Sequence, residues 1–366
     1  MLLLRWLIRR RRPRAFCLLI AAVTASCAFA SPAGVTDVPN LQARSLPVHL
    51  GAGYFTGIMW SRSGWLVAGF AANPEAITGS TQEVWAFRAN GRDIHQISLP
   101  NDPRCQKTEY AAPTSLADGR PALVKTCDLP PERGPVASYA LVAYDLETGG
   151  TQEILGPQDK VNPGVFSFNP GLDRAIVGTG GDFCSTIAWL TREGPEPIRI
   201  SMGSGSNSWR LDQAFERSQQ QDCTKLGRAD LPSWSPDGTQ IAFFASPESV
   251  GRSGQDRLLP PWDLYLMDAH KLKPHTVTGQ VTGPSAPAWS PDSHSISFSA
   301  TVNGTRGTWI LDSRTGRLRG FTRIPAQDIG WSPDGHQIAI LHDKSSPSQY
   351  PPDIEILLYD VSSLLK

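Results

Sequence analysis

The sequence predicts an all-β fold, a six-bladed β-propeller of four-stranded antiparallel blades closed by an N-terminal strand. Three observations lead to this prediction. A pattern containing Trp-Ser-Pro-Asp recurs along the chain, and repetition at a period of tens of residues is typical of propellers and other repeat folds. Short segments in which apolar residues alternate follow the copies. Glycine and proline make up 64 of the 366 residues without a collagen period, which indicates many turns.

Six copies of the pattern can be recognised, three of them closely matched. The close copies span residues 232–243, 287–298 and 329–340, and the degenerate copies span residues 60–68, 115–124 and 168–177. Each close copy has a short strand that ends in Trp, a tight Ser-Pro-Asp turn and a second, alternating strand. In such a turn Pro presets φ and Asp accepts hydrogen bonds from nearby backbone.

The repeated Trp and Asp side chains are interpreted as structural. We expect the aromatic residues to pack between neighbouring sheets rather than to form a ligand cage. The carboxylates are expected to cap their turns, and calcium binding is the less favoured alternative, because it needs several convergent oxygens. The residues concerned are Trp234, Asp237, Trp289, Asp292, Trp331 and Asp334.

A further apolar strand follows every copy, and five of these strands run into a polar turn and one more strand. The segments lie at residues 84–88, 141–145, 187–191, 264–268, 308–312 and 356–360. Each unit is therefore predicted to be a four-stranded sheet. The average unit exceeds the ~40–45 residues of compact propeller repeats. The additional residues are assigned to insertions at about residues 100–135, 203–230 and 246–262.

The sixth unit ends too early to contain its fourth strand. A propeller must close its ring or leave exposed sheet edges. The segment 45–50 precedes the first copy and is the natural donor of the missing outer strand. Pro47 is tolerable there, because an outer strand is an edge strand.

The N-terminus is predicted to be a secretory signal peptide, residues 1–30. It contains six arginines and no acid, then an uncharged apolar run and the small-x-small site Ala28-Phe29-Ala30. An uncleaved signal anchor and a lipoprotein signal are the alternatives. Residues 31–44 are interpreted as a flexible linker and residues 45–366 as a single propeller. Without the signal the chain keeps 28 basic and 34 acidic residues, a net charge of −6, which argues against nucleic-acid binding.

Four cysteines remain after the signal peptide. An even number in an exported chain is consistent with two disulfides. The favoured pairs are Cys105–Cys127 and Cys184–Cys223, because each pair lies within one insertion between strands. Three pairings are possible, and buried free thiols are the alternative.

The repeated Trp-Ser-Pro-Asp-Gly pattern resembles the TolB-like, or WD40-like (PD40), β-propeller repeat family. The resemblance covers about residues 45–362. It implies the propeller fold but specifies function poorly, since the family includes periplasmic TolB, propeller domains of prolyl-oligopeptidase-like peptidases and uncharacterised exported proteins. We expect neither the N-terminal domain of TolB nor an α/β-hydrolase domain in this chain.

The search for catalytic motifs is negative. The chain has no G-x-S-x-G, H-E-x-x-H, C-x-x-C or G-x-G-x-x-G. No catalytic residue, cofactor or metal is therefore assigned. His294 and His336 occupy similar turn positions in neighbouring units, but exposed turn tips are the favoured interpretation. The polar insertion 203–230 contains Trp209 and Arg210, residue types common at binding hot spots.

Two functions follow from these observations. The first is a non-catalytic exported module, expected as a monomer in the periplasm or outside the cell, that binds a protein or peptide of the cell envelope. The alternative is a hydrolase or lyase with its active site in the central channel. A convergent cluster of ionisable side chains in the channel would favour the enzyme, and an uncharged channel would favour the binding module.

Overall fold

The fold is described from a computed structural model of the chain. The described residues are 41–73, 81–128, 137–158, 165–179, 185–203, 208–220, 227–247, 261–346 and 349–365. They belong to one compact unit, residues 35–366. The predicted signal peptide, residues 1–30, lies outside the described residues.

Antiparallel sheets follow one another along the chain. The first is β2 (Gly53–Trp60), β3 (Trp65–Ala72), β4 (Thr81–Arg88) and β5 (His95–Gln96). The second is β6 (Lys107–Ser115), β7 (Pro121–Asp128), β8 (Ala137–Tyr144) and β9 (Thr151–Gln158). The third is β10 (Phe166–Phe168), β11 (Ala175–Thr179), β12 (Thr186–Thr191) and β13 (Gly194–Pro197).

A larger sheet of eight strands comes next. Its first half is β16 (Arg228–Trp234), β17 (Gln240–Ser246), β18 (Trp262–Asp268) and β19 (Pro274–Thr282). Its second half is β20 (Ala288–Trp289), β21 (Ser295–Val302), β22 (Thr305–Asp312) and β23 (Leu318–Thr322), and the halves join where β19 pairs with β21. The last sheet is β24 (Asp328–Trp331), β25 (Gln337–Asp343), β26 (Ile354–Asp360) and β1 (Arg44–Ser45).

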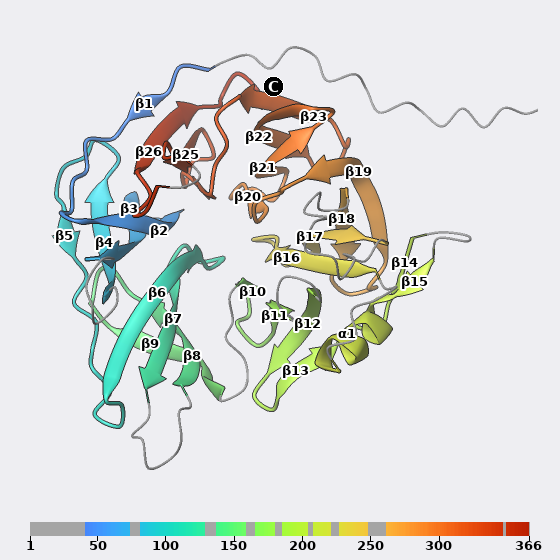
Figure 1. Cartoon of the computed structure of the whole chain (residues 1–366), viewed down its shortest axis with the longest axis horizontal. Coiled ribbons are helices and arrows are strands. Elements are labelled where there is room, and N and C mark those ends of the chain that lie inside the picture. The colour runs from blue at the N-terminus through green and yellow to red at the C-terminus, as the bar shows by residue number, and fades with distance from the viewer. Residues whose placement is uncertain are drawn as a thin grey trace, which may run out of the picture. The chain divides into compact units, whose positions relative to one another are not determined.

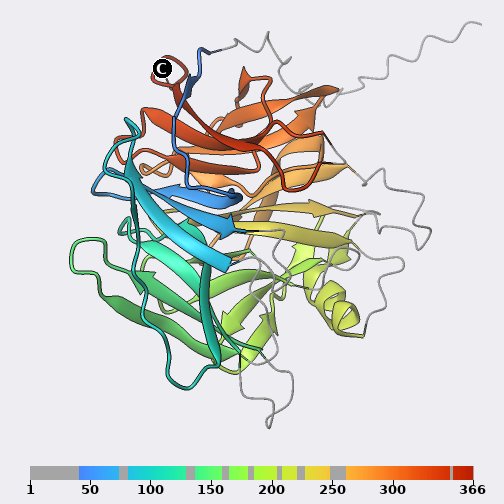
Figure 2. The same cartoon turned by 60° about the vertical axis from the view of Figure 1, so that its left-hand side comes forward.

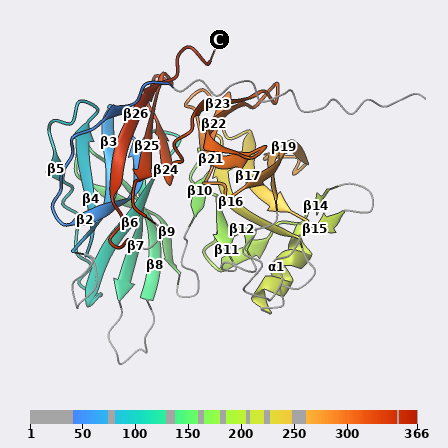
Figure 3. The same cartoon turned by 45° about the horizontal axis from the view of Figure 1, so that its top comes forward.

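These sheets surround a common centre, with β10, β16 and β20 among the strands nearest to it (Figure 1). The chain is thus an all-β protein with the propeller arrangement that the repeats predict. The first and last sheets are neighbours, since β2 contacts both β24 and β25 (Figure 3).

Sheet packing follows from the alternation within each strand. In β17, Ile241, Phe243 and Ala245 belong to one buried cluster, whereas Ala242 and Phe244 belong to the next. Successive residues of a strand point to opposite faces of the sheet. Each face of this sheet is therefore covered by a hydrophobic core, which explains why the strand is apolar at every position from 241 to 245.

The repeated turn has the hydrogen bonds that its sequence predicts. The Asp237 carboxylate accepts the Ser235 hydroxyl at 2.7 Å and the Thr239 N–H at 3.0 Å, and Gly238 has a φ of +75°. Asp292 and Asp334 accept the equivalent bonds in their own turns. Bonds from the Ser332 hydroxyl and then the His336 N–H lower the pKa of Asp334. These carboxylates act as turn caps.

The repeated tryptophans connect neighbouring sheet units. The Trp289 indole N–H donates to the carbonyl of Ser233 at 3.1 Å, and that of Trp331 donates to the carbonyl of Ala288 at 3.0 Å. Each indole therefore reaches the first strand of the preceding unit, and each residue is almost fully buried.

The N-terminal segment completes the last sheet, although its paired residues differ from the expected ones. β1 pairs with β26 through Arg44↔Leu358 and Ser45↔Leu357. Beyond it, Leu46 still donates its backbone N–H to the carbonyl of Ile356 at 2.9 Å, and the side chains of Leu46 and Val48 lie in a core shared by the first and last sheets. The expectation that residues 45–50 form this strand is corrected, because the paired strand is Arg44–Ser45 and the side chains of Leu46 and Val48 are buried in the core, which removes their apolar surface from water. β1 thus begins at Arg44, the last residue of the segment interpreted as a linker.

Two expected insertions also differ. Most of residues 107–128 lies in β6 and β7 instead of in an irregular insertion. Within 203–230 the structure has a helix, α1 (Leu211–Gln219), at the outer margin of the ring (Figures 1 and 2). Its buried residues, Leu211, Ala214, Phe215 and Ser218, have the spacing of one helical face. Among the described residues no helix is both long and apolar enough to span a membrane.

Closure can be tested at the buried residues that follow β1. Leu46→Ala should lower the free energy of unfolding by about 2–5 kcal/mol, because it leaves a cavity between the first and last sheets. His49→Ala, at an exposed position of the same segment, should change it by less than about 0.5 kcal/mol. Urea denaturation measures both. Equal stability of the two variants would contradict closure by this segment.

Candidate functional site

The candidate site is a cavity of about 370 Å³ at the centre of the ring. Its lining comes from the first strand of every sheet unit, namely β2, β6, β10, β16, β20 and β24, and from adjoining segments. We call this cavity the channel. Because each unit contributes the same part of its repeat, the repeat that builds the ring also determines the composition of the channel wall.

Proline is common in the channel wall and occupies repeated positions. Pro113, Pro232 and Pro287 each lie two residues before the last residue of an inner strand, while the remaining three belong to Ser-Pro-Asp turns. An inner strand has one edge facing the channel, where an ordinary residue would leave its N–H without a partner. Proline has no N–H to leave unpaired. The wall is therefore smooth, rigid and poor in backbone donors.

Tryptophan is the second common lining residue. Trp60, Trp234, Trp289 and Trp331 line the channel, but each is at most 8% exposed. They therefore expose little surface to a ligand, and most of their surface is used in packing between sheets.

Two ionisable side chains belong to the described lining, Arg62 and Asp328. Asp328 is the first residue of β24. One of its oxygens accepts the N–H of Ile58 in β2 at 2.7 Å, and the other accepts the N–H of Ile329 at 2.9 Å. The pairing of β2 with β3 shifts register between Phe55 and Gly57, just before the N–H that Asp328 receives. Burial raises the pKa of Asp328 to about 6, although both backbone donors oppose the shift.

The binding residues expected from the sequence lie elsewhere. The Trp209 ring is half-buried and covers Gly227, where an added Cβ would lie 2.4 Å from the indole. Arg210 forms an ion pair with Asp212 at 2.7 Å. Neither residue belongs to the channel lining. Both form the short strand β15 (Trp209–Arg210), directly before α1.

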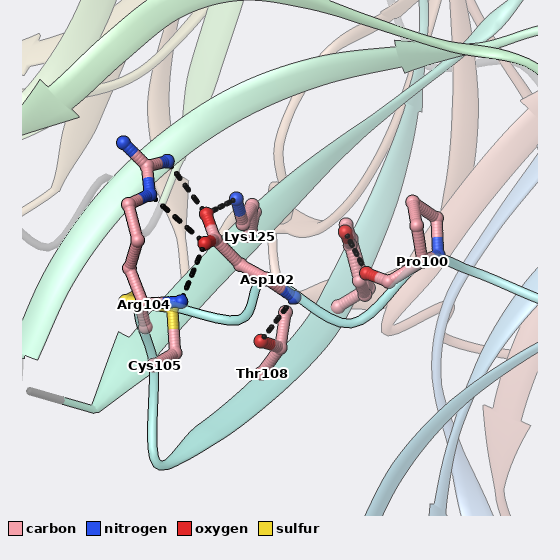
Figure 4. Close-up of a disulfide and its surroundings, with 8 residues drawn as sticks. Pro100, Asp102, Arg104, Cys105, Thr108 and Lys125 are labelled. Carbon is pink, nitrogen blue, oxygen red and sulfur yellow. Dashed lines mark hydrogen bonds and ion pairs between the residues drawn. A yellow bond between two sulfur atoms is a disulfide. The ribbon is translucent and has the colours of Figure 1, made fainter.

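Cys105 and Cys127 form a disulfide, one of the two pairs that the sequence favours. It holds the segment before β6 against β7 (Figure 4). Beside it, Asp102 accepts hydrogen bonds from Arg104 and from Lys125, whose Nζ lies 2.6 Å from the carboxylate. These bonds hold the pKa of Asp102 well below its usual range. The other favoured pair, Cys184 and Cys223, lies outside the described residues.

No cluster of His, Cys, Asp and Glu suited to a metal ion occurs within the described residues. His294 lies 3.2 Å from Asp292 of its own turn, and both side chains are largely exposed. His336 is exposed at the equivalent turn of the next sheet. Neither histidine lines the channel.

Sequence reasoning missed Asp328, although a signal was available. It lies three residues before Trp331, where the other close copies have Leu231 and Ala286. When the three close copies are aligned, this position holds a charged residue in one copy and apolar residues in the other two. That difference is the signal that the sequence offered.

Comparison with known proteins supports the fold. No protein-family model matches the chain. A crystal structure of TolB from Acinetobacter baumannii is similar at a TM-score of 0.50 and 15% identity, over 83% of this chain. The chain spans only 65% of the length of that TolB. The predicted resemblance to TolB-like propellers is therefore confirmed at the level of the fold.

Two further structures resemble the chain more distantly. A putative TolB from Agrobacterium tumefaciens has a TM-score of 0.45 and 16% identity, over 84% of this chain and 90% of its own. An oligogalacturonate lyase in complex with manganese has a TM-score of 0.47 and 12% identity, over 86% and 91%. Neither similarity is close enough to bear on function.

The disulfide can be tested by replacing both cysteines. The two half-cystines are 22 residues apart, and opening a loop of this length should cost about 3 kcal/mol of stability through the greater freedom of the unfolded chain. Urea denaturation of the Cys105→Ser/Cys127→Ser protein measures the loss. A double variant as stable as the wild type would show that this bridge does not stabilise the fold.

The pKa of Asp328 makes its effect on stability depend on pH. Between about pH 4 and pH 6 the folded state holds this proton more tightly than the unfolded state, whose Asp pKa is about 3.9. The contribution of Asp328 to stability should therefore fall as pH rises through this range. The free energy of unfolding of the wild type, minus that of Asp328→Asn, should decrease from pH 4 to pH 7. A constant or increasing difference would contradict the raised pKa of Asp328.

Proposed function

We propose that this chain is an exported, non-catalytic six-bladed propeller that binds a segment of a partner protein in its channel. The count of six treats the eight-stranded sheet as two blades. Its halves are joined by only two residue pairs, Val281↔Val302 and Thr282↔Thr301, and each half contains one close copy of the repeat. The remaining four-stranded sheets are the other four blades.

The composition of the channel wall is the observation on which the binding role depends. Prolines, tryptophans and small residues surround a space of about 370 Å³, which lies in the range of ligand pockets, roughly 300–1,000 Å³. A wall built from the backbones of packed strands and from proline rings loses little conformational freedom when a ligand enters, so less of the interaction energy is spent on ordering. A short peptide segment fits these properties.

The same wall gives less support to catalysis. Hydrolases and lyases that use acid–base chemistry place ionisable side chains within hydrogen-bond reach of the reacting bond, commonly one acid and one base. In the described lining only Asp328 and Arg62 are ionisable, and no ion pair between them occurs among the described contacts. We therefore favour the binding module over the enzyme.

Export and an envelope partner are part of the proposal. The signal peptide expected at residues 1–30 supports export, and so does the Cys105–Cys127 disulfide, since disulfides persist mainly in oxidising compartments. The partner would then be a protein or peptide of the periplasm, envelope or exterior.

Selection of peptides tests the binding role directly. The purified protein should retain members of a library of randomised twelve-residue peptides displayed on phage. Ser115 is exposed at the channel wall, so Ser115→Trp should obstruct entry and weaken the selected peptides at least about tenfold, a change of about 1.4 kcal/mol.

Thr148→Trp is the matched control, because Thr148 is exposed on the turn between β8 and β9 and does not line the channel. It should leave affinity unchanged. Failure to select any peptide, or equal binding to the two variants, would overturn the proposed function.

A further inference from the structure

Asp328 is a partly exposed carboxylate of the channel lining, and no described residue supplies a counter-charge for it. Its two described hydrogen bonds come from neutral backbone N–H groups, of Ile58 and Ile329. No ion pair of the described residues includes it. The rise of its pKa to about 6 has burial as its cause, with no lowering from any cation.

A structural role alone does not account for the charge. A serine or asparagine oxygen could also accept the N–H of Ile58 without the cost of removing a carboxylate from water. Charges that are largely removed from water are normally paired in proteins, because an unpaired charge there costs more free energy than a neutral polar group. The missing partner must be able to reach Asp328, and the channel provides the route, since Asp328 belongs to its lining.

We propose that Asp328 binds a basic side chain, lysine or arginine, of the peptide segment that enters the channel. This inference rests on the function proposed above and specifies the ligand. The wall suits such a side chain, because its methylene stem can pack against proline and tryptophan rings while its charged end meets the carboxylate. The exposed Arg62 is surrounded by solvent, which screens its repulsion.

The test uses single peptides from the same selection, synthesised and titrated against the protein by calorimetry. Peptides that bind the wild type and fail to bind Ser115→Trp should contain lysine or arginine. Replacing that residue by norleucine, which keeps the stem and removes the charge, should weaken binding about tenfold or more, because the charge-assisted hydrogen bond to the carboxylate is lost.

Asp328→Asn should weaken the basic peptide to the same extent and leave the norleucine peptide unaffected, since the charge pair would be absent in either case. Asn can still accept the N–H of Ile58, so the variant should fold. Glu193→Gln, on the exposed turn between β12 and β13, removes a negative charge elsewhere and should leave affinity unchanged.

The outcomes separate the two proposals. The peptides that bind the wild type and fail to bind Ser115→Trp test the basic ligand. If these peptides bind equally well with norleucine in place of the basic residue, or bind Asp328→Asn as tightly as the wild type, the proposal of a basic ligand is wrong while the binding function stands. If no peptide binds the wild type and fails to bind Ser115→Trp, both the proposed function and this inference are wrong. If Asp328→Asn does not fold, the norleucine comparison on the wild-type protein decides the question alone.

Discussion

The contact between the first strand of one sheet unit and the first strand of the unit before it determines most of this structure. The Trp residue at the end of the strand fills the space between sheets and, in Trp289 and Trp331, donates its indole N–H to the preceding inner strand. The Trp234 unit makes its contact through the backbone, with Trp234 N–H donating to the Ser167 hydroxyl. Each bond fixes the next sheet relative to the last, so the units must curve around a centre.

The centre that results is lined by strand edges, and this constraint explains its chemistry. A strand edge that faces the centre has no neighbouring strand to pair with its N–H groups, and proline at repeated positions removes such donors. Where the ring closes, the bulge in β2 turns the N–H of Ile58 toward the last sheet, and Asp328 receives it. Closure thus places the one carboxylate of the described lining at the junction of the first and last sheets. The same residue joins the ring and supplies the charge that a ligand can recognise.

The fold was more predictable from sequence than the site. Copies of the turn and the alternating strands predicted the sheets, because their signals are local and recur. The sequence predicted that an N-terminal strand completes the last sheet, but it placed this strand too far along the chain. The burial of Leu46 and Val48 depends on neighbours that are distant in sequence. The helix α1 was missed because its polar surroundings concealed four apolar or small residues at helical spacing.

The candidate site was hard to predict, because its properties arise from several segments that meet only in the folded chain. Trp209 and Arg210 have the composition of a binding loop, yet packing and an ion pair occupy them. Asp is a common residue type, and Asp328 stands out only when the inner strands meet and leave it partly buried in the channel lining. A comparison between repeats can identify such a residue as an exception, but its burial requires the closed ring.

Photo-cross-linking in the cells that make this protein tests the central claim, that the channel holds a segment of a partner. A photoreactive phenylalanine analogue would replace Ala288 in the channel wall and, separately, Thr148 on an outer turn. The account predicts one discrete covalent adduct from position 288 and none from position 148. No adduct from position 288, or the same adducts from both positions, would contradict it.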